Sequence, residues 1–198
     1  MNLRAHTYDL IIDPLLAGLK KSVKENIPAG VSVIDVACGT GSLALSVASV
    51  AVKVTGIDLD NSLIDFAVRR AIKRKVYNAE FLVKDAACLQ EYGERQFGVA
   101  VTSMAIHQFE EDLAISILKE MKRIAGKVII ADYNFPMPPG FSQEVAYVIE
   151  RFAGGDHYRN FRNYMSKGGL EWFAGSAGLR IRPLVSKVNR IFTVVDCI

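Results

Sequence analysis

Strands and helices alternate along residues 31–131, and this alternation constrains the fold more than any other feature of the sequence. Short runs rich in β-branched residues predict strands, and the apolar residues between most of these runs recur at helical spacing. Strands are expected at about 31–36, 50–58, 80–84, 97–103 and 127–131, with helices at about 42–49, 62–72 and 110–123, the second of them capped by Ser62. Continuously apolar strands that alternate with helices indicate a parallel sheet covered on both faces.

The remainder of the chain completes this arrangement. An N-terminal helical cap is expected over residues 1–29 and a lid-like insertion over 134–166, in which 154–167 is polar and aromatic and predicts a loop. Two strands, at about 179–187 and 190–197, are separated by a short turn and predict an antiparallel hairpin at the sheet edge. We therefore expect one domain over residues 1–198: an α/β, Rossmann-like doubly wound sheet, mostly parallel, of seven strands with an antiparallel C-terminal hairpin strand.

Composition excludes several classes of protein. Hydrophobic residues make up 51% of the chain, enough for a full core, and the net charge of +3 is too small to indicate nucleic-acid binding. The three cysteines have neither zinc-site nor disulfide spacing, so we expect no metal site and a reducing compartment. No apolar run approaches the ~20 residues that span a bilayer, and no signal segment is evident. A cytoplasmic protein is expected, of unknown oligomeric state.

Three acidic residues follow three successive predicted strands. Asp35 precedes a turn of small residues, Ala37-Cys38-Gly39-Thr40-Gly41, that opens a helix, and Asp58 and Asp85 end or follow the next two strands. Ligands of open parallel sheets bind outside the carboxyl ends of the strands, where the strand order reverses. Glycine allows the backbone to approach a ligand closely. This arrangement predicts a nucleoside-binding site, with Asp58 placed to accept hydrogen bonds from ribose hydroxyls.

Two ligands compete for this turn. The segment 39–44 also satisfies the dinucleotide pattern GxGxxG/A, which favours an NAD(P)-dependent reductase. However, a carboxylate at Asp35 would repel a pyrophosphate and attract a ligand that carries an ammonium and a sulfonium. Asp35 therefore favours S-adenosylmethionine. A third alternative is a non-catalytic nucleoside-binding or partner-binding module.

The segment IDVACGTG, which contains Asp35, resembles the first motif of the class I S-adenosylmethionine-dependent methyltransferases. Ala37 stands where the commonest form has glycine, as in the branch of ubiquinone/menaquinone C-methyltransferases that act on small molecules. The resemblance covers about residues 30–133. It implies methyl transfer from S-adenosylmethionine to a small-molecule acceptor, with S-adenosylhomocysteine as the product.

The resemblance also implies roles for individual residues. Asp35 and the turn would hold the methionine part, Asp58 the ribose, Leu59 the adenine face, Asp85 and Ala86 the adenine edge, and Ser103 the ammonium. His107, just beyond the fourth strand, is a candidate base, although it could instead only line the pocket. The candidate cofactor residues are Asp35, Ala37, Cys38, Gly39, Thr40, Gly41, Asp58, Leu59, Asp85, Ala86 and Ser103.

The acceptor pocket is less well defined by the sequence. More than half of the aromatic residues lie between 133 and 173, where they could line a cavity for an apolar small molecule or form a satellite core. The expected pocket residues are Tyr8, His107, Tyr133, His157 and Arg159. An Asn/Asp-Pro-Pro-aromatic motif is absent after the fourth strand, which disfavours methylation of nucleobase amino groups.

Overall fold

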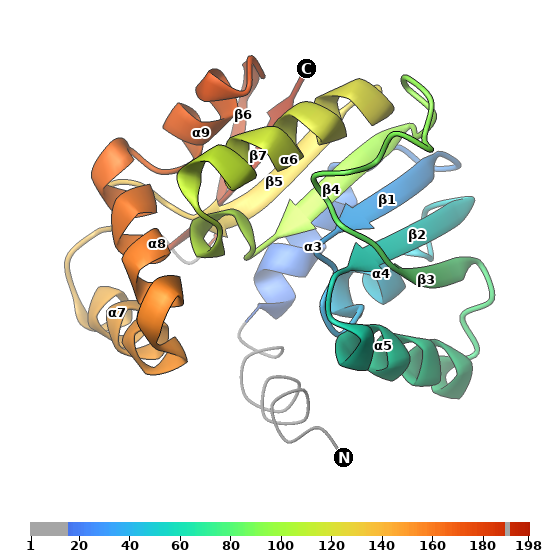
Figure 1. The fold of residues 1–198 in the computed structure, drawn as a ribbon, viewed down its shortest axis with the longest axis horizontal. Helices are drawn as coiled ribbons and strands as arrows, with labels where there is room; N and C mark the ends of the chain where they lie inside the picture. The colour runs from blue at the N-terminus through green and yellow to red at the C-terminus, as the bar shows by residue number, and fades with distance from the viewer. Residues whose placement is uncertain (1–15, 189–190) are drawn as a thin grey trace.

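The computed structural model describes residues 16–188 and 191–198. Within these residues a seven-stranded sheet has the order β3-β2-β1-β4-β5-β7-β6 (Figure 1). Strands β1 to β5 are parallel, whereas β7 runs antiparallel to both β5 and β6. The strands are β1 (Ser32–Val36), β2 (Lys53–Asp58), β3 (Ala79–Val83), β4 (Val99–Ser103), β5 (Val128–Tyr133), β6 (Ile181–Val188) and β7 (Phe192–Cys197). The predicted fold class is confirmed.

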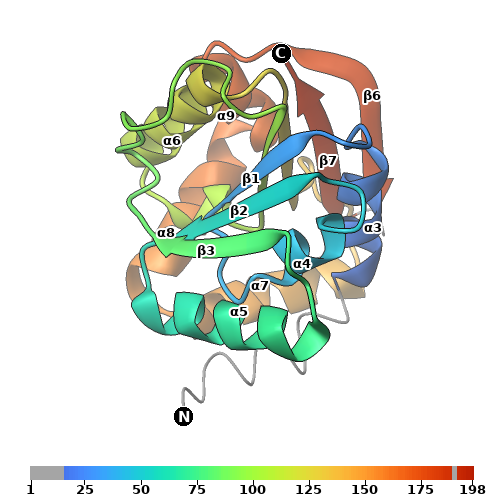
Figure 2. The same ribbon diagram turned by 90° about the vertical axis from the view of Figure 1, so that its right-hand side faces the viewer.

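Helices cover both faces of the sheet. Helices α3, α4 and α5 lie on one face and α6 and α9 on the other, while α7 and α8 pack together beside the ends of β4 and β5 (Figures 1 and 2). The helices are α3 (Ala17–Glu25), α4 (Ser42–Val47), α5 (Asn61–Arg74), η2 (Ile106–Gln108, a 3-10 turn), α6 (Glu111–Ile124), α7 (Phe141–Ala153), α8 (Gly155–Lys167) and α9 (Leu170–Ser176). No helix within the described residues is long and apolar enough to cross a membrane.

The central strands are buried because helices cover both sides of the sheet. All six residues of β5 are buried, and α6 buries an apolar stripe that includes Ile117, Leu118 and Met121. Each such side chain contributes roughly 1.5–3 kcal/mol when it is removed from water. This explains why the sequences of these strands are almost continuously apolar rather than alternating.

Two local predictions were wrong. Residues 154–167 were expected to form a loop, but they form α8, because Phe161, Tyr164 and Met165 share one buried helical face among the polar residues. Ser62 was expected to cap α5, but Asp60 is the cap: its side chain accepts hydrogen bonds from the backbone N–H groups of Ser62 and Leu63. A short carboxylate one residue before the helix makes a better cap than a serine within its first turn.

The strand order reverses at β1, which lies between β2 and β4. The carboxyl end of β1 is therefore the switch point at which open α/β sheets bind ligands. Asp35 is paired in register with Gly56 of β2 and Val101 of β4, so the predicted turn begins at this point. The part of the expected N-terminal cap before residue 16 lies outside the described residues.

Candidate functional site

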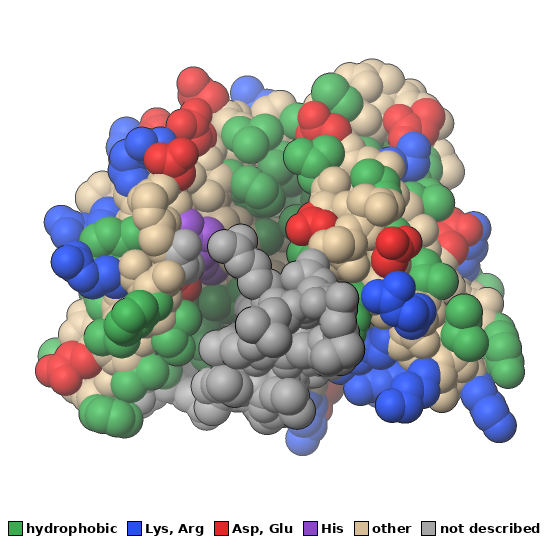
Figure 3. All heavy atoms as spheres, turned by 60° about the horizontal axis from the view of Figure 1, so that its bottom comes forward, with side chains coloured by type: hydrophobic (Ala, Val, Ile, Leu, Met, Phe, Trp, Pro, Cys, Tyr) green, Lys and Arg blue, Asp and Glu red, His purple; other side chains and the backbone are tan. Residues whose placement is uncertain are grey.

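A cavity of about 590 Å³ lies at the carboxyl ends of the central strands. This volume is within the range of small-molecule sites, about 300–1,000 Å³. On this face the surface is hollowed between two raised parts, with mainly hydrophobic side chains on the walls and histidine atoms at one side (Figure 3). The predicted residues that line the cavity are Asp35, Ala37, Cys38, Gly39, Thr40, Asp58, Leu59, Asp85, Ala86, Ser103, His107, Tyr133 and His157. The structure thus brings together residues from six separate segments.

The turn after β1 has an unusual backbone conformation. Ala37 and Gly39 have φ angles of 58° and 52°, and a Cβ added at Gly39 would meet no atom within 4 Å. Asp58 holds this turn, because its Oδ2 accepts a 2.8 Å hydrogen bond from the Gly39 N–H. Its Oδ1 accepts from the Asp60 N–H at 3.0 Å. Each carboxylate oxygen has a second lone pair, so Asp58 can still accept hydrogen bonds from a ligand.

Asp35 is less ionised than the sequence suggests. Its side chain is only 1% exposed, and Oδ2 has no hydrogen-bond partner among the described residues. Burial raises the pKa of Asp35 to about 8; a backbone hydrogen bond with Ala44 lowers the pKa, and the nearby charge of Asp58 raises it. Asp35 is therefore mostly neutral at pH 7, and it would regain its charge beside a bound cation.

This burial predicts a pH dependence of stability. The pKa of Asp35 rises from 3.8 to about 8 on folding. Between these two pH values the folded chain keeps a proton on Asp35 that the unfolded chain has lost, so the free energy of unfolding falls as the pH rises through this range. We expect Asp35→Asn to gain free energy of unfolding relative to wild type, by up to about 1.4 kcal/mol per pH unit between pH 5 and 8. Urea unfolding at several pH values measures this gain. Parallel stability curves for the two proteins would contradict it.

The predicted nucleoside residues surround the adjacent part of the cavity. Leu59 is 71% exposed although it is apolar, as expected of a side chain that packs on a ligand ring. Asp85 follows β3, and its Oδ1 accepts a hydrogen bond from the Ala87 N–H at 2.9 Å. Ser103 ends β4, and Met104 next to it has a φ of 56°. Such strain in a non-glycine residue is typical of functional sites.

Two predicted site residues, Gly41 and Arg159, do not line the cavity, and a third lies outside the described residues. Gly41 faces the core, where a Cβ would lie 2.7 Å from the Phe81 ring and 2.8 Å from Ala67. Arg159 is exposed and forms ion pairs with Glu110 and Asp156, because it lies on the outer side of α8. Tyr8 lies outside the described residues. Among the ten aromatic residues between 133 and 173, Tyr133 lines the described cavity, while Phe161, Tyr164 and Phe173 are buried core residues.

A second polar group forms the opposite wall of the cavity. His107 is 1% exposed, and its Nδ1 lies 2.6 Å from Asp132 Oδ1. The same carboxylate accepts hydrogen bonds from the backbone N–H groups of His107 and Tyr133, at 3.3 and 2.7 Å. The Tyr133 hydroxyl donates to Glu150 Oε1 at 2.7 Å. His157 completes the group, with its Nδ1 3.0 Å from Glu150 Oε2.

The protonation of His107 follows from these neighbours. Burial alone lowers the pKa of the imidazole, but the charges of Asp132 and Glu150 and their hydrogen bonds raise it to about 9. Burial also opposes ionisation of Glu150, yet hydrogen bonds from His107, His157 and Tyr133 hold its pKa below the usual value. At pH 7 His107 is therefore a proton donor rather than a free base.

Sequence reasoning missed Asp132 and Glu150. Asp132 is the only charged residue in the buried strand β5, and an acid in such a strand requires a partner, so this signal was present in the sequence. Glu150 gave no signal, because α7 ends at Ala153 and α8 begins at Gly155, so Glu150 and His157 lie on different helices. The seven-residue separation from His157 therefore does not correspond to one helical face. Only the turn between the two helices brings these side chains together.

Helix α8 is tied to the wall that carries His107. The Asn160 side chain donates a hydrogen bond to the Gln108 carbonyl oxygen at 2.8 Å, and Asn163 donates to Glu111 Oε2 at 3.0 Å. Lys167 forms an ion pair with the same carboxylate at 3.2 Å. These contacts join α8 to η2 and to the first turn of α6.

Comparison with known proteins gives consistent results. Residues 33–127 match the family described as Methyltransferase domain. Over 133 residues the chain is 35% identical to phosphoethanolamine N-methyltransferase 1 of Triticum aestivum. The matched segment covers 65% of this chain and 26% of that protein. Over 116 residues the chain is 30% identical to the ubiquinone/menaquinone biosynthesis C-methyltransferase of Geobacter sp. (strain M21). This match covers 55% of this chain and 48% of that protein.

The chain thus spans about a quarter of the wheat protein and about half of the Geobacter protein. Among solved structures, a SAM dependent methyltransferase from Aquifex aeolicus superposes with a TM-score of 0.71 at 17% identity, covering 98% of this chain and 96% of that one. At this identity the likeness concerns the fold. Residues 33–127 are thus similar in sequence to a methyltransferase domain, and the fold resembles that of a solved SAM dependent methyltransferase.

Proposed function

We propose that the protein transfers a methyl group from S-adenosylmethionine to a small-molecule acceptor bound in the same cavity. The observation that carries the proposal is the convergence of Asp35, Asp58 and Asp85, from the ends of three successive strands, on one cavity beside the glycine turn. The names of the relatives, which act on phosphoethanolamine and on quinone precursors, support a small-molecule acceptor.

The turn suits this cofactor better than a dinucleotide. The Gly39 N–H is already bonded to the Asp58 carboxylate, so it is not free to bind a phosphate oxygen. A pyrophosphate there would also face Asp35. The ammonium and sulfonium of S-adenosylmethionine would instead be attracted to these carboxyl groups, and the open space at Gly39 leaves room beside the backbone. An NAD(P)-dependent reductase is therefore the weaker alternative.

The residues of the chain would act mainly by positioning. Bound S-adenosylmethionine would supply a methyl group on a positively charged sulfur, and the departing thioether is neutral. Asp58, Asp85 and Leu59 would fix the nucleoside, and the carboxyl groups at β1 and β2 would offset the positive charge. Tyr133 and His107 would hold the acceptor in line with the methyl group, which is the largest contribution that a protein can make here.

Binding measurements test the proposal directly. Isothermal titration of the full chain should show binding of S-adenosylmethionine and S-adenosylhomocysteine, and no binding of NADH at similar concentrations. The reverse preference would defeat the proposal. Transfer of radiolabelled methyl groups to a panel of small phosphobases, phenols and quinone precursors would then separate an enzyme from a module that only binds the nucleoside.

Asp58 provides the sharpest variant for this site. Asp58→Ala removes charge-assisted hydrogen bonds worth ~1.5–3 kcal/mol, so the affinity for S-adenosylhomocysteine should fall roughly 10- to 150-fold. Asp58→Asn keeps an oxygen that can accept from the Gly39 N–H and should lose less. Asp60→Ala is the matched control, because it removes the α5 cap without changing a cavity residue. Equal affinities for wild type and Asp58→Ala would exclude contact between Asp58 and the ribose.

A further inference from the structure

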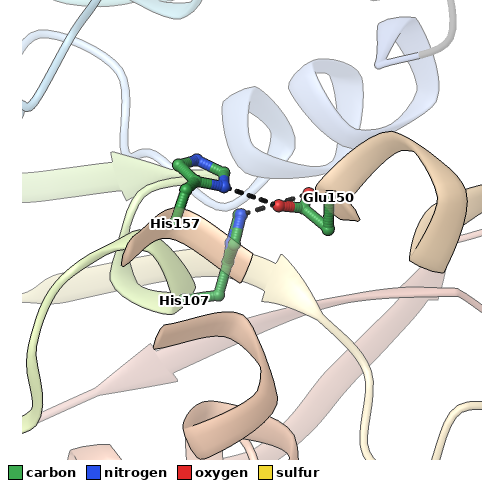
Figure 4. Close-up of side chains that lie close together, drawn as sticks. All are labelled: His107, Glu150 and His157. Atoms are coloured by element: carbon green, nitrogen blue, oxygen red, sulfur yellow. Dashed lines mark ion pairs between the residues drawn. The ribbon is translucent and has the colours of Figure 1, made fainter. Parts of the chain in front are cut away.

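The side chains of His107, Glu150 and His157 converge from three separate elements. His107 comes from η2, Glu150 from the last turn of α7 and His157 from the first turn of α8, and both imidazoles point toward the carboxylate (Figure 4). His107 Nε2 lies 3.4 Å from Glu150 Oε1, and His157 Nδ1 lies 3.0 Å from Glu150 Oε2. One ligand atom from each residue lies within 4.8 Å of the other two.

Either the second proton of the His107 ring or a metal ion that replaces it must lie between these facing atoms. His107 Nε2, Glu150 Oε2 and His157 Nδ1 are buried, and both imidazole nitrogens face the Glu150 carboxylate at ion-pair distance. The Asp132 carboxylate contacts His107 Nδ1, so this nitrogen carries a proton and Nε2 of the neutral ring is left with a lone pair. A lone pair that faces a carboxylate is unfavourable unless a proton or a metal ion lies between them.

The surroundings match those of a metal ligand set. A histidine that binds a metal usually donates its other N–H to a carboxylate, and Asp132 accepts that proton from His107. Glu150 is oriented by the Tyr133 hydroxyl at 2.7 Å, as a ligating carboxylate commonly is. All three potential ligands line the cavity, so a bound ion would retain a coordination position open to a small molecule. Sites with three protein ligands and one open position are typical of catalytic rather than structural zinc.

We propose that His107, Glu150 and His157 form a binding site for a divalent transition metal such as Zn²⁺, with an open position that faces the cavity. Two imidazoles and one carboxylate suit Zn²⁺, Fe²⁺ or Co²⁺, whereas Mg²⁺ and Ca²⁺ prefer oxygen ligands. Ligand atoms around a tetrahedral zinc ion lie about 3.3 Å apart at bond lengths of about 2.0–2.1 Å. The observed separations of 3.0 and 3.4 Å, which run to the two different oxygens of Glu150, are close to this spacing, and a set with one atom from each residue lies within 4.8 Å.

The open position would accept an oxygen, nitrogen or sulfur atom of a bound small molecule. This use of the metal rests on the proposed function, since it makes the ion a contact for the methyl acceptor. The metal site itself does not rest on it, because the ligand set can be tested without cofactor or acceptor. The sequence predicted no metal site, and the proposal departs from that expectation.

Metal titration of the chelator-treated full chain tests the site. We expect one Zn²⁺ per chain by competition with a chromophoric chelator, and a visible absorption band when Co²⁺ replaces Zn²⁺. His157→Ala and Glu150→Gln should each weaken Zn²⁺ binding at least about 10- to 100-fold and abolish the Co²⁺ band. Glu144→Gln, an exposed acid on the same helix α7, is the matched control and should bind like wild type.

Folding and cofactor binding are measured on the same samples. His157 is 28% exposed, so His157→Ala should remain folded even where Glu150→Gln does not, and circular dichroism checks this. Absence of stoichiometric binding, or equal binding by wild type and His157→Ala, would overturn the metal site and indicate that protons alone occupy the cluster. Loss of S-adenosylmethionine binding in a chain that still binds Zn²⁺ would instead refute only the proposed function.

Discussion

Replacing Asp132 by alanine should lower the free energy of unfolding by about 3–5 kcal/mol, as expected when one partner of a buried pair is removed. Asp132 is fully buried and accepts hydrogen bonds from the His107 ring and from two backbone N–H groups. Without the carboxylate, these three donors would have no acceptor, and each unsatisfied donor costs ~1–3 kcal/mol. Urea unfolding at pH 7 measures the loss.

Asp132→Asn removes the negative charge of the side chain but nearly keeps its shape. The amide retains one oxygen acceptor and nearly the same volume, so the loss should be smaller than for alanine. Asp156→Ala is a suitable control, because Asp156 is an exposed acid that pairs only with a surface arginine in the described structure, and such pairs contribute about 0–1 kcal/mol. A loss below about 1 kcal/mol for Asp132→Ala would mean that the His107 wall does not depend on this carboxylate.

Gly41→Ala should lower the free energy of unfolding by about 2–5 kcal/mol. Gly41 has a φ of 71°, which costs an L-residue about 1–2 kcal/mol. Its new Cβ would also lie 2.7 Å from the Phe81 ring and 2.8 Å from the Ala67 Cβ, and such overpacking costs about 1–3 kcal/mol. Because Gly41 begins α4, relief of the clash should displace the turn at Gly39 and weaken nucleoside binding as well.

Gly30→Ala measures the conformational part of this effect alone, so the difference between the two variants gives the steric part. Gly30 has a φ of 74°, almost the same as Gly41, but a Cβ there would meet no atom within 4 Å. Alanine at position 30 should therefore incur the conformational cost alone, about 1–2 kcal/mol. Chemical denaturation of both variants gives the comparison. Equal losses at the two positions would show that Phe81 moves aside without cost.

The sequence predicted most of the sheet because its signals are local. Strands such as β1 and β5 are apolar on both faces, and the charge order of α6, with Glu111 and Asp112 at its start and Lys122 and Arg123 at its end, marks that helix clearly. Helix α8 escaped prediction because its apolar residues are few among many polar ones. Its helical face becomes evident only when Phe161 and Tyr164 are seen to pack on the rest of the chain.

The candidate site also has one part that the sequence predicted and one part that it did not. The residues of the first turn, together with Asp58 and Asp85, follow predictable strand ends, so their convergence could be inferred from the order of the strands. The wall of His107, Asp132 and Glu150 depends on tertiary packing across more than forty positions of sequence, which no local pattern records. Burial also changed the chemistry of residues that were correctly located, as the raised pKa of Asp35 shows.

The tethering of α8 to η2 and α6 affects how the cavity would admit a ligand. Because Asn160 and Asn163 bond α8 to η2 and α6, these hydrogen bonds oppose changes in the separation of the two imidazoles. A preorganised wall loses little conformational entropy on binding. At the wall formed by His107 and His157, the choice between ligands would therefore depend on the size and shape of the ligand rather than on rearrangement of the protein around it.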